Sequence, residues 1–175
     1  MPQLRWIDPN KLIDAAQDLA AHHSGPGRPK HTLLRRSVST AYYALYHHLC
    51  LEGARVLLPQ ANQAMQLAFV RGFGHAEIKD CCGWIAGRKG GVSPPVKPIV
   101  ALLGQSPFVA VSDTFWDLQE ARHQADYDHL AAFSKASALA SVADARRAMA
   151  DVSAAAADVR QAFFVLVAMR ARLPK

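Results

Sequence analysis

The fold class is indicated most clearly by residues 134–172, SKASALASVADARRAMADVSAAAADVRQAFFVLVAMRAR. Alanine, the best helix former, dominates this stretch, and neither glycine nor proline occurs anywhere from 108 to 173. Apolar or small residues also recur at intervals of seven, in one row formed by Val142, Met149, Ala156 and Phe163 and in a second row formed by Ala145, Val152, Val159 and Leu166. The pattern predicts one long helix over 134–172 that packs against neighbouring helices at a shallow angle.

The part of the chain before this helix carries further helix signals. Asp8, followed by Pro9 and Asn10, is suited to cap a helix over 11–23, and a turn rich in glycine and proline follows at 24–29. Helices are predicted over 30–58, where Pro59 ends the helix, and over 60–71, 75–85 and from about 107 or 113 to 125. Glycines, prolines and basic residues predict an irregular, mobile loop over about 87–98.

Length and composition limit the class of protein. With 175 residues, 51% of them apolar and 19% charged, the chain resembles a globular protein and not an intrinsically disordered one. This length suits a single domain over 1–175 with a substantial core. Neither the alternation of a β-strand nor an internal repeat is visible. We therefore expect an all-α fold, an antiparallel bundle of four to five helices with a long C-terminal helix.

The cysteines and the apolar runs bear on location and cofactors. Three cysteines, two of them adjacent at Cys81 and Cys82, suit reduced thiols better than a secreted disulfide framework. His75 precedes the pair, but no second pair at a familiar spacing completes a zinc site, so we expect no metal and no cofactor. The N-terminus lacks the apolar core of a signal peptide, and the longest apolar run, 162–169, is too short to cross a membrane. A cytoplasmic protein without a membrane segment is predicted.

The net charge of +6, from 20 Lys and Arg against 14 Asp and Glu, weakly favours an acidic partner. Nucleic acid is the commonest such partner, although this excess of charge is also ordinary for soluble proteins. The candidate RNA-binding residues are Arg35 and Arg36, near the start of the predicted helix 30–58, and Arg88 and Lys89 in the loop. A solvated face explains either cluster equally well.

The stretch RHQADYDH, residues 122–129, carries the most specific chemical signal. An arginine keeps its charge at any physiological pH, and a histidine exchanges protons near neutrality. Arg122 and His129 could therefore neutralise a phosphate and move a proton during attack on a phosphodiester. In an unbroken helix the two residues would stand about 10 Å apart, so we expect either a helix break at 126–128, which Asp128 could cap, or completion of the site by a second subunit. The competing interpretation is an ordinary ion pair between Arg122 and Asp126 on a solvated face.

The predicted helix 30–58 presents a polar stripe beside its apolar one. Arg36, Thr40, Tyr43 and His47 follow one another at intervals of four, three and four residues, which places them on one line of the helix. Tyrosines and histidines buried in helical bundles more often hydrogen-bond one another than touch a ligand. Tyr43 and His47 are therefore candidates for a supporting role only.

Two motifs resemble those of one superfamily. RSVSTAYYALYHH, residues 36–48, is similar to the tyrosine-rich second helix of HEPN (higher eukaryotes and prokaryotes nucleotide-binding) domains. Arg122 and His129 resemble the arginine and histidine of the superfamily's second motif, which are separated by four to six residues. His123 is among the polar residue types usual after that arginine, and the following Ala-Asp-Tyr, 125–127, is similar to a sequence found there in many small bacterial members.

The resemblance implies a four- or five-helix domain that dimerises so that both motifs line one cleft, often as a metal-independent endoribonuclease. In such an enzyme His129 would act as general base on a ribose 2'-hydroxyl and Arg122 would stabilise charge on the phosphate. His123, Asp126 and Tyr127 would be supporting groups.

Three functions remain open at this point. The first is an RNA-cleaving homodimer, a toxin or defence component that a partner such as an antitoxin restrains. The second is a non-catalytic module that binds nucleotide or protein and partners a nucleotidyltransferase or another regulator. The third is a purely structural helical bundle.

Overall fold

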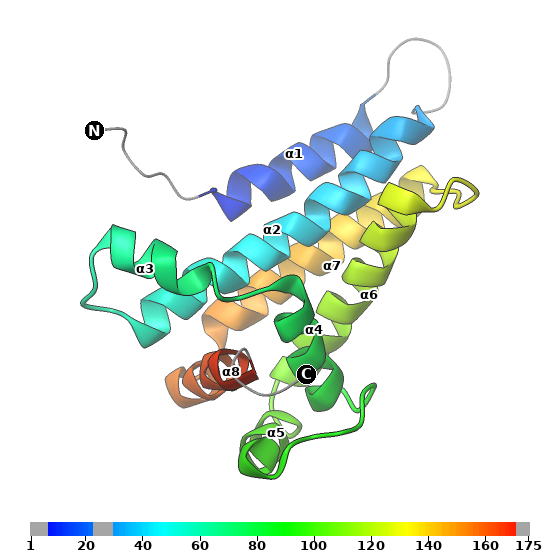
Figure 1. Ribbon diagram of the computed structural model, residues 1–175. Helices are drawn as coiled ribbons and strands as arrows, with labels where there is room; N and C mark the ends of the chain where they lie inside the picture. The colour runs from blue at the N-terminus through cyan, green and yellow to red at the C-terminus, as the bar shows by residue number, and fades with distance from the viewer. Residues whose placement is uncertain (1–6, 23–29, 171–175) are drawn as a thin grey trace. The chain divides into compact units, whose positions relative to one another are not determined.

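The computed structural model describes residues 7–22 and 30–170, and in this part of the chain the regular secondary structure is entirely helical (Figure 1). The helices are α1 (Pro9–Ala21), α2 (His31–Leu57), α3 (Gln63–Val70), α4 (His75–Ile85), the short 3-10 helix η1 (Pro94–Val96), α5 (Lys97–Leu103), α6 (Phe108–Tyr127), α7 (Lys135–Ala154) and α8 (Ala157–Arg170). The predicted all-α class is confirmed. The predicted turn at 24–29 lies outside the described residues, as do residue 23 and residues 171–172 of two predicted helices.

The chain forms two compact units. The first, which we call the motif unit, comprises 7–22, 30–48 and 114–149 of the described residues and contains both sequence motifs. The second, the companion unit, comprises 49–113 and 150–170 of the described residues. α2, α6 and α7 each contribute residues to both units. A single domain over 1–175 stays a prediction.

Helix boundaries follow the signals in the sequence. The Oδ1 of Asp8 accepts hydrogen bonds from the backbone N–H groups of Asn10, at 2.9 Å, and Lys11, at 3.5 Å, which confirms the predicted N-cap. Helix α2 ends at Leu57, shortly before Pro59, and α4 has the predicted bounds. α1 and the first half of α2 run antiparallel, as do the second half of α6 and the start of α7 (Figure 1).

The predicted loop at 87–98 is irregular only in its first part. Gly87 and Gly91 have φ values of 69° and 76°, a region that side chains disfavour, which accounts for glycine at these two positions. Helical structure resumes at Pro94 and continues through Pro98 in α5, so the prediction was wrong for its last residues. Proline is compatible with the first turn of a helix, because the N–H that it lacks has no partner there in any case.

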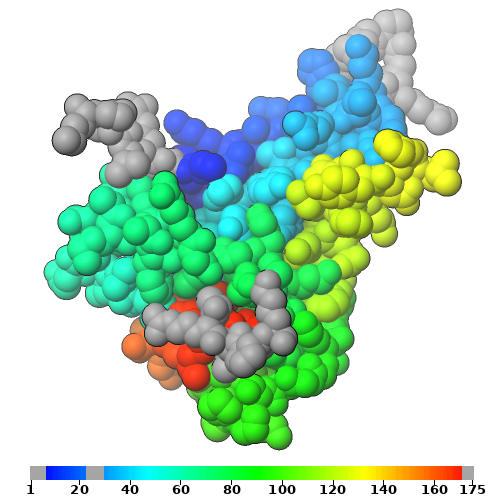
Figure 2. All heavy atoms as spheres, viewed as in Figure 1, coloured from blue at the N-terminus to red at the C-terminus, as the bar shows by residue number. Residues whose placement is uncertain are grey.

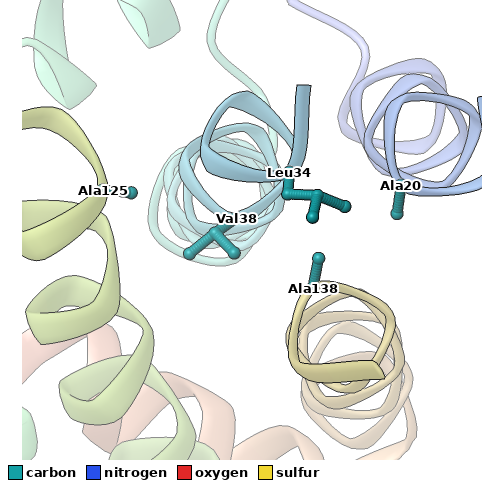
Figure 3. Close-up of a cluster of buried hydrophobic side chains, with 5 residues drawn as sticks. All are labelled: Ala20, Leu34, Val38, Ala125 and Ala138. Atoms are coloured by element: carbon teal, nitrogen blue, oxygen red, sulfur yellow. The ribbon is translucent and has the colours of Figure 1, made fainter. Parts of the chain in front are cut away.

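The motif unit is held together by small residues and a few larger apolar ones. Its buried cluster takes one or two residues from each of four helices: Ala20 from α1, Leu34 and Val38 from α2, Ala125 from α6 and Ala138 from α7 (Figure 3). Alanine at three of these positions allows the helices to approach closely. The end of α6 is therefore anchored directly in the core of this unit.

The companion unit has an aromatic core. Phe163 of α8 is fully buried, with its ring centroid 4.7 Å from that of Phe108 and 5.2 Å from that of Phe164. Gly53 of α2 is also buried, and a Cβ atom there would lie 2.5 Å from the Phe73 ring and 3.1 Å from the Phe164 ring. Glycine at this position gives the two phenylalanines the space that they occupy.

The predicted long helix over 134–172 is wrong. The chain forms α7 and α8 instead, bent by 113° at Ala155 and Ala156. The seven-residue rows are buried up to Met149 and Val152 and again from Phe163, whereas Ala156 between them is exposed. The methyl side chains of the alanines at 154–157 could bury little apolar surface in a straight helix, so we attribute the bend to the burial of Phe163 and Phe164. Packing thus overrides local helix propensity here.

No single helix within 7–22 and 30–170 is both long enough and apolar enough to cross a membrane. Two helix pairs, 94–103 with 108–127 and 135–154 with 157–170, reach the necessary length and composition only when each pair is taken together across its bend.

Candidate functional site

Arg122 lies near the end of α6, in contact with α2. Its Nη2 donates a hydrogen bond to the Oη of Tyr43 at 2.7 Å. Its Nε lies 2.8 Å from Oδ2 of Asp126, an ion pair that lacks the angle of a hydrogen bond. The predicted pair of Arg122 and Asp126 therefore forms. It does not lie on a solvated face, however, because the two side chains are only 23% and 19% exposed.

The surroundings of Arg122 keep it charged. Burial by itself lowers the pKa of this guanidinium, but the hydrogen bond to Tyr43 and the electrostatic influence of Tyr43, Asp126 and Tyr127 outweigh it and raise the pKa. Of the five N–H groups of the guanidinium, one donates to Tyr43 and one faces Asp126. Among the described residues, no hydrogen bond or ion pair accounts for the remaining N–H groups.

Aromatic rings connect the other predicted residues to Arg122. Its guanidinium carbon lies 5.4 Å from the ring centroids of both Tyr43 and Tyr127, within the range of a cation–π interaction. The Tyr43 ring stacks on His47 at 6.4 Å, and the Tyr127 ring lies 5.1 Å from His123. The structure thus brings together Arg122 and all five residues predicted to support it.

His129 lies on the turn after α6. The helix ends at Tyr127, and Asp128 Oδ1 accepts a hydrogen bond from the backbone N–H of Leu130 at 2.8 Å. The predicted helix break and the predicted capping role of Asp128 are therefore confirmed. Figure 2 shows the end of α6 and this turn, in yellow, at the surface. The His129 side chain is exposed, and no contact among the described residues joins it to Arg122.

The two arginines predicted to bind RNA on α2 differ in their surroundings. Arg36 is exposed. Arg35 is half-buried, and its guanidinium donates to backbone carbonyl groups at the end of α6 and in the turn after it. Arg36 is therefore open to a phosphate, whereas Arg35 already has protein partners.

Arg88 and Lys89 belong to the companion unit, and both side chains have acidic partners. Arg88 Nε donates to Oδ1 of Asp113 at 2.7 Å, and Lys89 pairs with Asp80. The backbone N–H groups of Arg88 and Lys89 both donate to the carbonyl of Gly83, at 2.8 and 3.0 Å. A role for these two residues in RNA binding stays a prediction.

Three further residues near the motif make contacts that the sequence did not predict. Ser39, buried on α2, donates from Oγ to Oδ2 of Asp126 at 3.3 Å, and so fixes the carboxylate that faces Arg122. The Oε1 of Gln119 is buried without a hydrogen-bond partner, one helical turn before Arg122. His31 Nε2 accepts the backbone N–H of Phe133 at 3.1 Å. Spacing from Arg122 alone would have drawn attention to Gln119, and His31 belongs to the basic cluster at the start of α2. No pattern in the sequence predicts the contact of His31 with Phe133 or that of Ser39 with Asp126.

Among the described residues, no three His, Cys, Asp or Glu side chains are close enough together to hold a metal ion.

The partial burial of His47 leads to a prediction about pH. Burial lowers the pKa of His47, because it disfavours the imidazolium form. The unfolded chain therefore binds this proton before the folded protein does. The free energy of unfolding is therefore unaffected by this group above about pH 6.5, the ordinary pKa of histidine, and falls as the pH drops below that value.

We expect the free energy of unfolding, measured in urea, to drop more for the wild type than for His47→Gln between about pH 7.5 and about pH 5.5. Equal drops would contradict the assignment.

Comparison with known proteins adds no relative: no protein-family model, no curated protein and no solved structure matches the chain. The functional interpretation is therefore built on the geometry around Arg122 and His129.

Proposed function

We propose that this protein is a metal-independent endoribonuclease of the HEPN type, acting as a toxin or a defence component. The observation that carries the proposal is the end of α6 at Tyr127, between the two motif residues. It leaves the His129 imidazole exposed on a turn, while Arg122 stays charged and held by Tyr43 and Asp126. A proton acceptor and a fixed positive charge are the two groups that cleavage through the 2'-hydroxyl uses, and the end of the helix leaves both on the same short segment.

The proposed reaction uses the substrate's own hydroxyl as nucleophile. His129 accepts the proton of a ribose 2'-hydroxyl, and the 2'-oxygen attacks the adjacent phosphorus. The bond from phosphorus to the 5'-oxygen breaks, and that oxygen takes up a proton from water. The products are a 2',3'-cyclic phosphate and a 5'-hydroxyl. The free N–H groups of Arg122 donate to the phosphate oxygens as negative charge gathers on them.

The neighbours of Arg122 have separate parts in this proposal. Asp126 and Tyr43 hold the guanidinium in one orientation, which reduces the ordering that substrate binding would otherwise require. Tyr127 flanks the guanidinium, and His123 packs against the Tyr127 ring. Arg36 offers an exposed charge for the RNA backbone.

One observation favours the second function, a non-catalytic module that binds nucleotide or protein and partners a nucleotidyltransferase or another regulator. Asp126 already neutralises part of the charge of Arg122, and the described contacts leave His129 apart from it. A site of this kind would bind a phosphate-bearing ligand without cleaving it.

We further propose that the active form is a homodimer in which both motifs share one site. Apolar side chains next to His129 support a partner surface there, since Tyr127 is 59% and Leu130 93% exposed. Light scattering at micromolar protein concentration is expected to give twice the 19.0 kDa mass of one chain. A monomer at that concentration would remove the shared site.

The proposed function is tested with purified protein and mixed RNA in the presence of EDTA. Cleavage is expected to continue in EDTA and to leave 2',3'-cyclic phosphate ends on the RNA fragments. Single-stranded DNA under the same conditions should remain intact. A requirement for divalent metal, or equal cutting of DNA, would contradict the mechanism. Binding of RNA without any cleavage would favour the non-catalytic module.

A further inference from the structure

The guanidinium of Arg35 makes an unusual number of contacts with one short segment of backbone. Its Nε donates to the carbonyl of Ala125 at 2.8 Å, and its Nη1 donates to that of Ala131 at 3.0 Å. Its Nη2 donates to the carbonyls of Gln124, at 3.2 Å, and Asp128, at 2.6 Å. Two of these carbonyls belong to the last turn of α6 and two to the turn that carries His129.

Two of these carbonyls already accept a backbone N–H group: that of Gln124 from Asp128 at 3.1 Å, and that of Asp128 from Ala131 at 3.3 Å. The last four carbonyl groups of a helix have no acceptor role within the helix, and the carbonyl end of the helix dipole favours a positive charge. Arg35 supplies further donors and a positive charge from α2, 89 to 96 residues away in the sequence. It thereby closes the end of α6 and fixes the path of the chain immediately afterwards.

A second contact from α2 reaches the far end of the same segment. His31 lies one helical turn before Arg35, on the same face of α2, and its Nε2 accepts the backbone N–H of Phe133 at 3.1 Å. The backbone from Gln124 to Phe133 is therefore held at both ends by the first turns of α2, with His129 between the two attachments.

We propose that Arg35 is a positioning residue that fixes the turn at 128–131 and thereby places the imidazole of His129. The catalytic consequence rests on the proposed function, but the structural part does not. Arg35 was predicted to bind RNA, and its contacts give it this other task. Lysine cannot replace it, because an ammonium group is a compact charge without the planar fork that reaches carbonyls on two sides.

The test compares Arg35→Lys with Arg36→Lys, its exposed neighbour on the same helix. Both changes keep the charge, so they differ only in the backbone contacts that they remove. Hydrogen exchange of backbone amides is expected to become at least about tenfold faster over 128–134 in Arg35→Lys, with α1 and the companion unit unchanged, and to stay at the wild-type rate in Arg36→Lys. His31→Phe, which removes only the Phe133 contact, should show a smaller increase over the same residues.

Cleavage kinetics separate positioning from substrate binding. For Arg35→Lys we expect kcat to fall by at least about tenfold with little change in KM, because the imidazole loses its fixed position. Arg36→Ala, which removes an exposed charge from the RNA-binding face, should instead raise KM and leave kcat in place. Faster exchange over 128–134 with an unchanged kcat would overturn the positioning role. Unchanged exchange would overturn the whole inference. If the wild type cleaves no RNA, the proposed function fails, and the exchange measurement still decides whether Arg35 fixes the turn.

Discussion

Arg122→Ala and His129→Ala are each expected to lower the rate of RNA cleavage by roughly 100-fold or more, which is the usual effect of deleting a positioned charge or a proton acceptor. Arg122→Ala removes the guanidinium that Tyr43 and Asp126 hold. His129→Ala removes the proposed general base. Neither change should alter the circular dichroism spectrum or the mass in solution, because His129 is exposed and Arg122 lies outside the buried apolar core.

Matched controls in the motif unit make this prediction specific. Arg147, whose side chain is 71% exposed, and His22, also exposed, allow the same two substitutions away from the motif. Arg147→Ala and His22→Ala are expected to cleave RNA at the wild-type rate. Asp126→Asn should reduce cleavage less than either motif variant, since Asp126 orients Arg122 and does not itself meet the substrate. If Arg122, Asp126 and His129 were only surface groups, all three changes would shift stability by under about 1 kcal/mol and leave activity untouched.

Phe163→Ala is expected to lower the free energy of unfolding by about 3–5 kcal/mol, the usual cost of removing a buried phenylalanine. Phe163 is fully inaccessible and contacts the rings of Phe108 and Phe164. Because we attribute the bend between α7 and α8 to this burial, the loss should be large and should be accompanied by faster amide exchange in α8.

The control for this prediction is Leu102→Ala, on α5 of the same unit, where the side chain is 50% exposed. Its effect in urea denaturation should stay below about 1 kcal/mol. A similarly small effect of Phe163→Ala would mean that burial of α8 does not determine where the helix breaks.

Much of the secondary structure could be predicted because its signals are local. Asp8 caps α1 from one residue away, and Pro59 limits α2 through its own missing N–H group. The bend at Ala155 and Ala156 could not be predicted, because nothing in those residues disfavours a helix. We attribute the bend to the contact between Phe163 and Phe108, which are 55 residues apart in the chain.

The candidate site was predicted in outline for the same reason. Spacing along α6 places Arg122 and Asp126 one turn apart, and Asp128 signals the end of the helix. The contact of Arg122 with Tyr43 joins residues 79 positions apart, and only the resemblance of both motifs to one superfamily linked them beforehand. The task of Arg35 could not be foreseen, because a basic side chain near a helix start predicts a phosphate contact as readily as a contact with distant carbonyl groups.

The most direct test of the account is cleavage of an RNA that carries a single 2'-deoxyribose at a mapped cut site. Purified wild-type protein in EDTA is expected to cleave the unmodified RNA at that linkage and to spare the deoxy linkage, while still cutting other sites in the same molecule. This result is required if the 2'-oxygen is the nucleophile and His129 accepts its proton. Cleavage at the deoxy linkage at the rate of the unmodified RNA, or no cleavage of either RNA, would contradict the account.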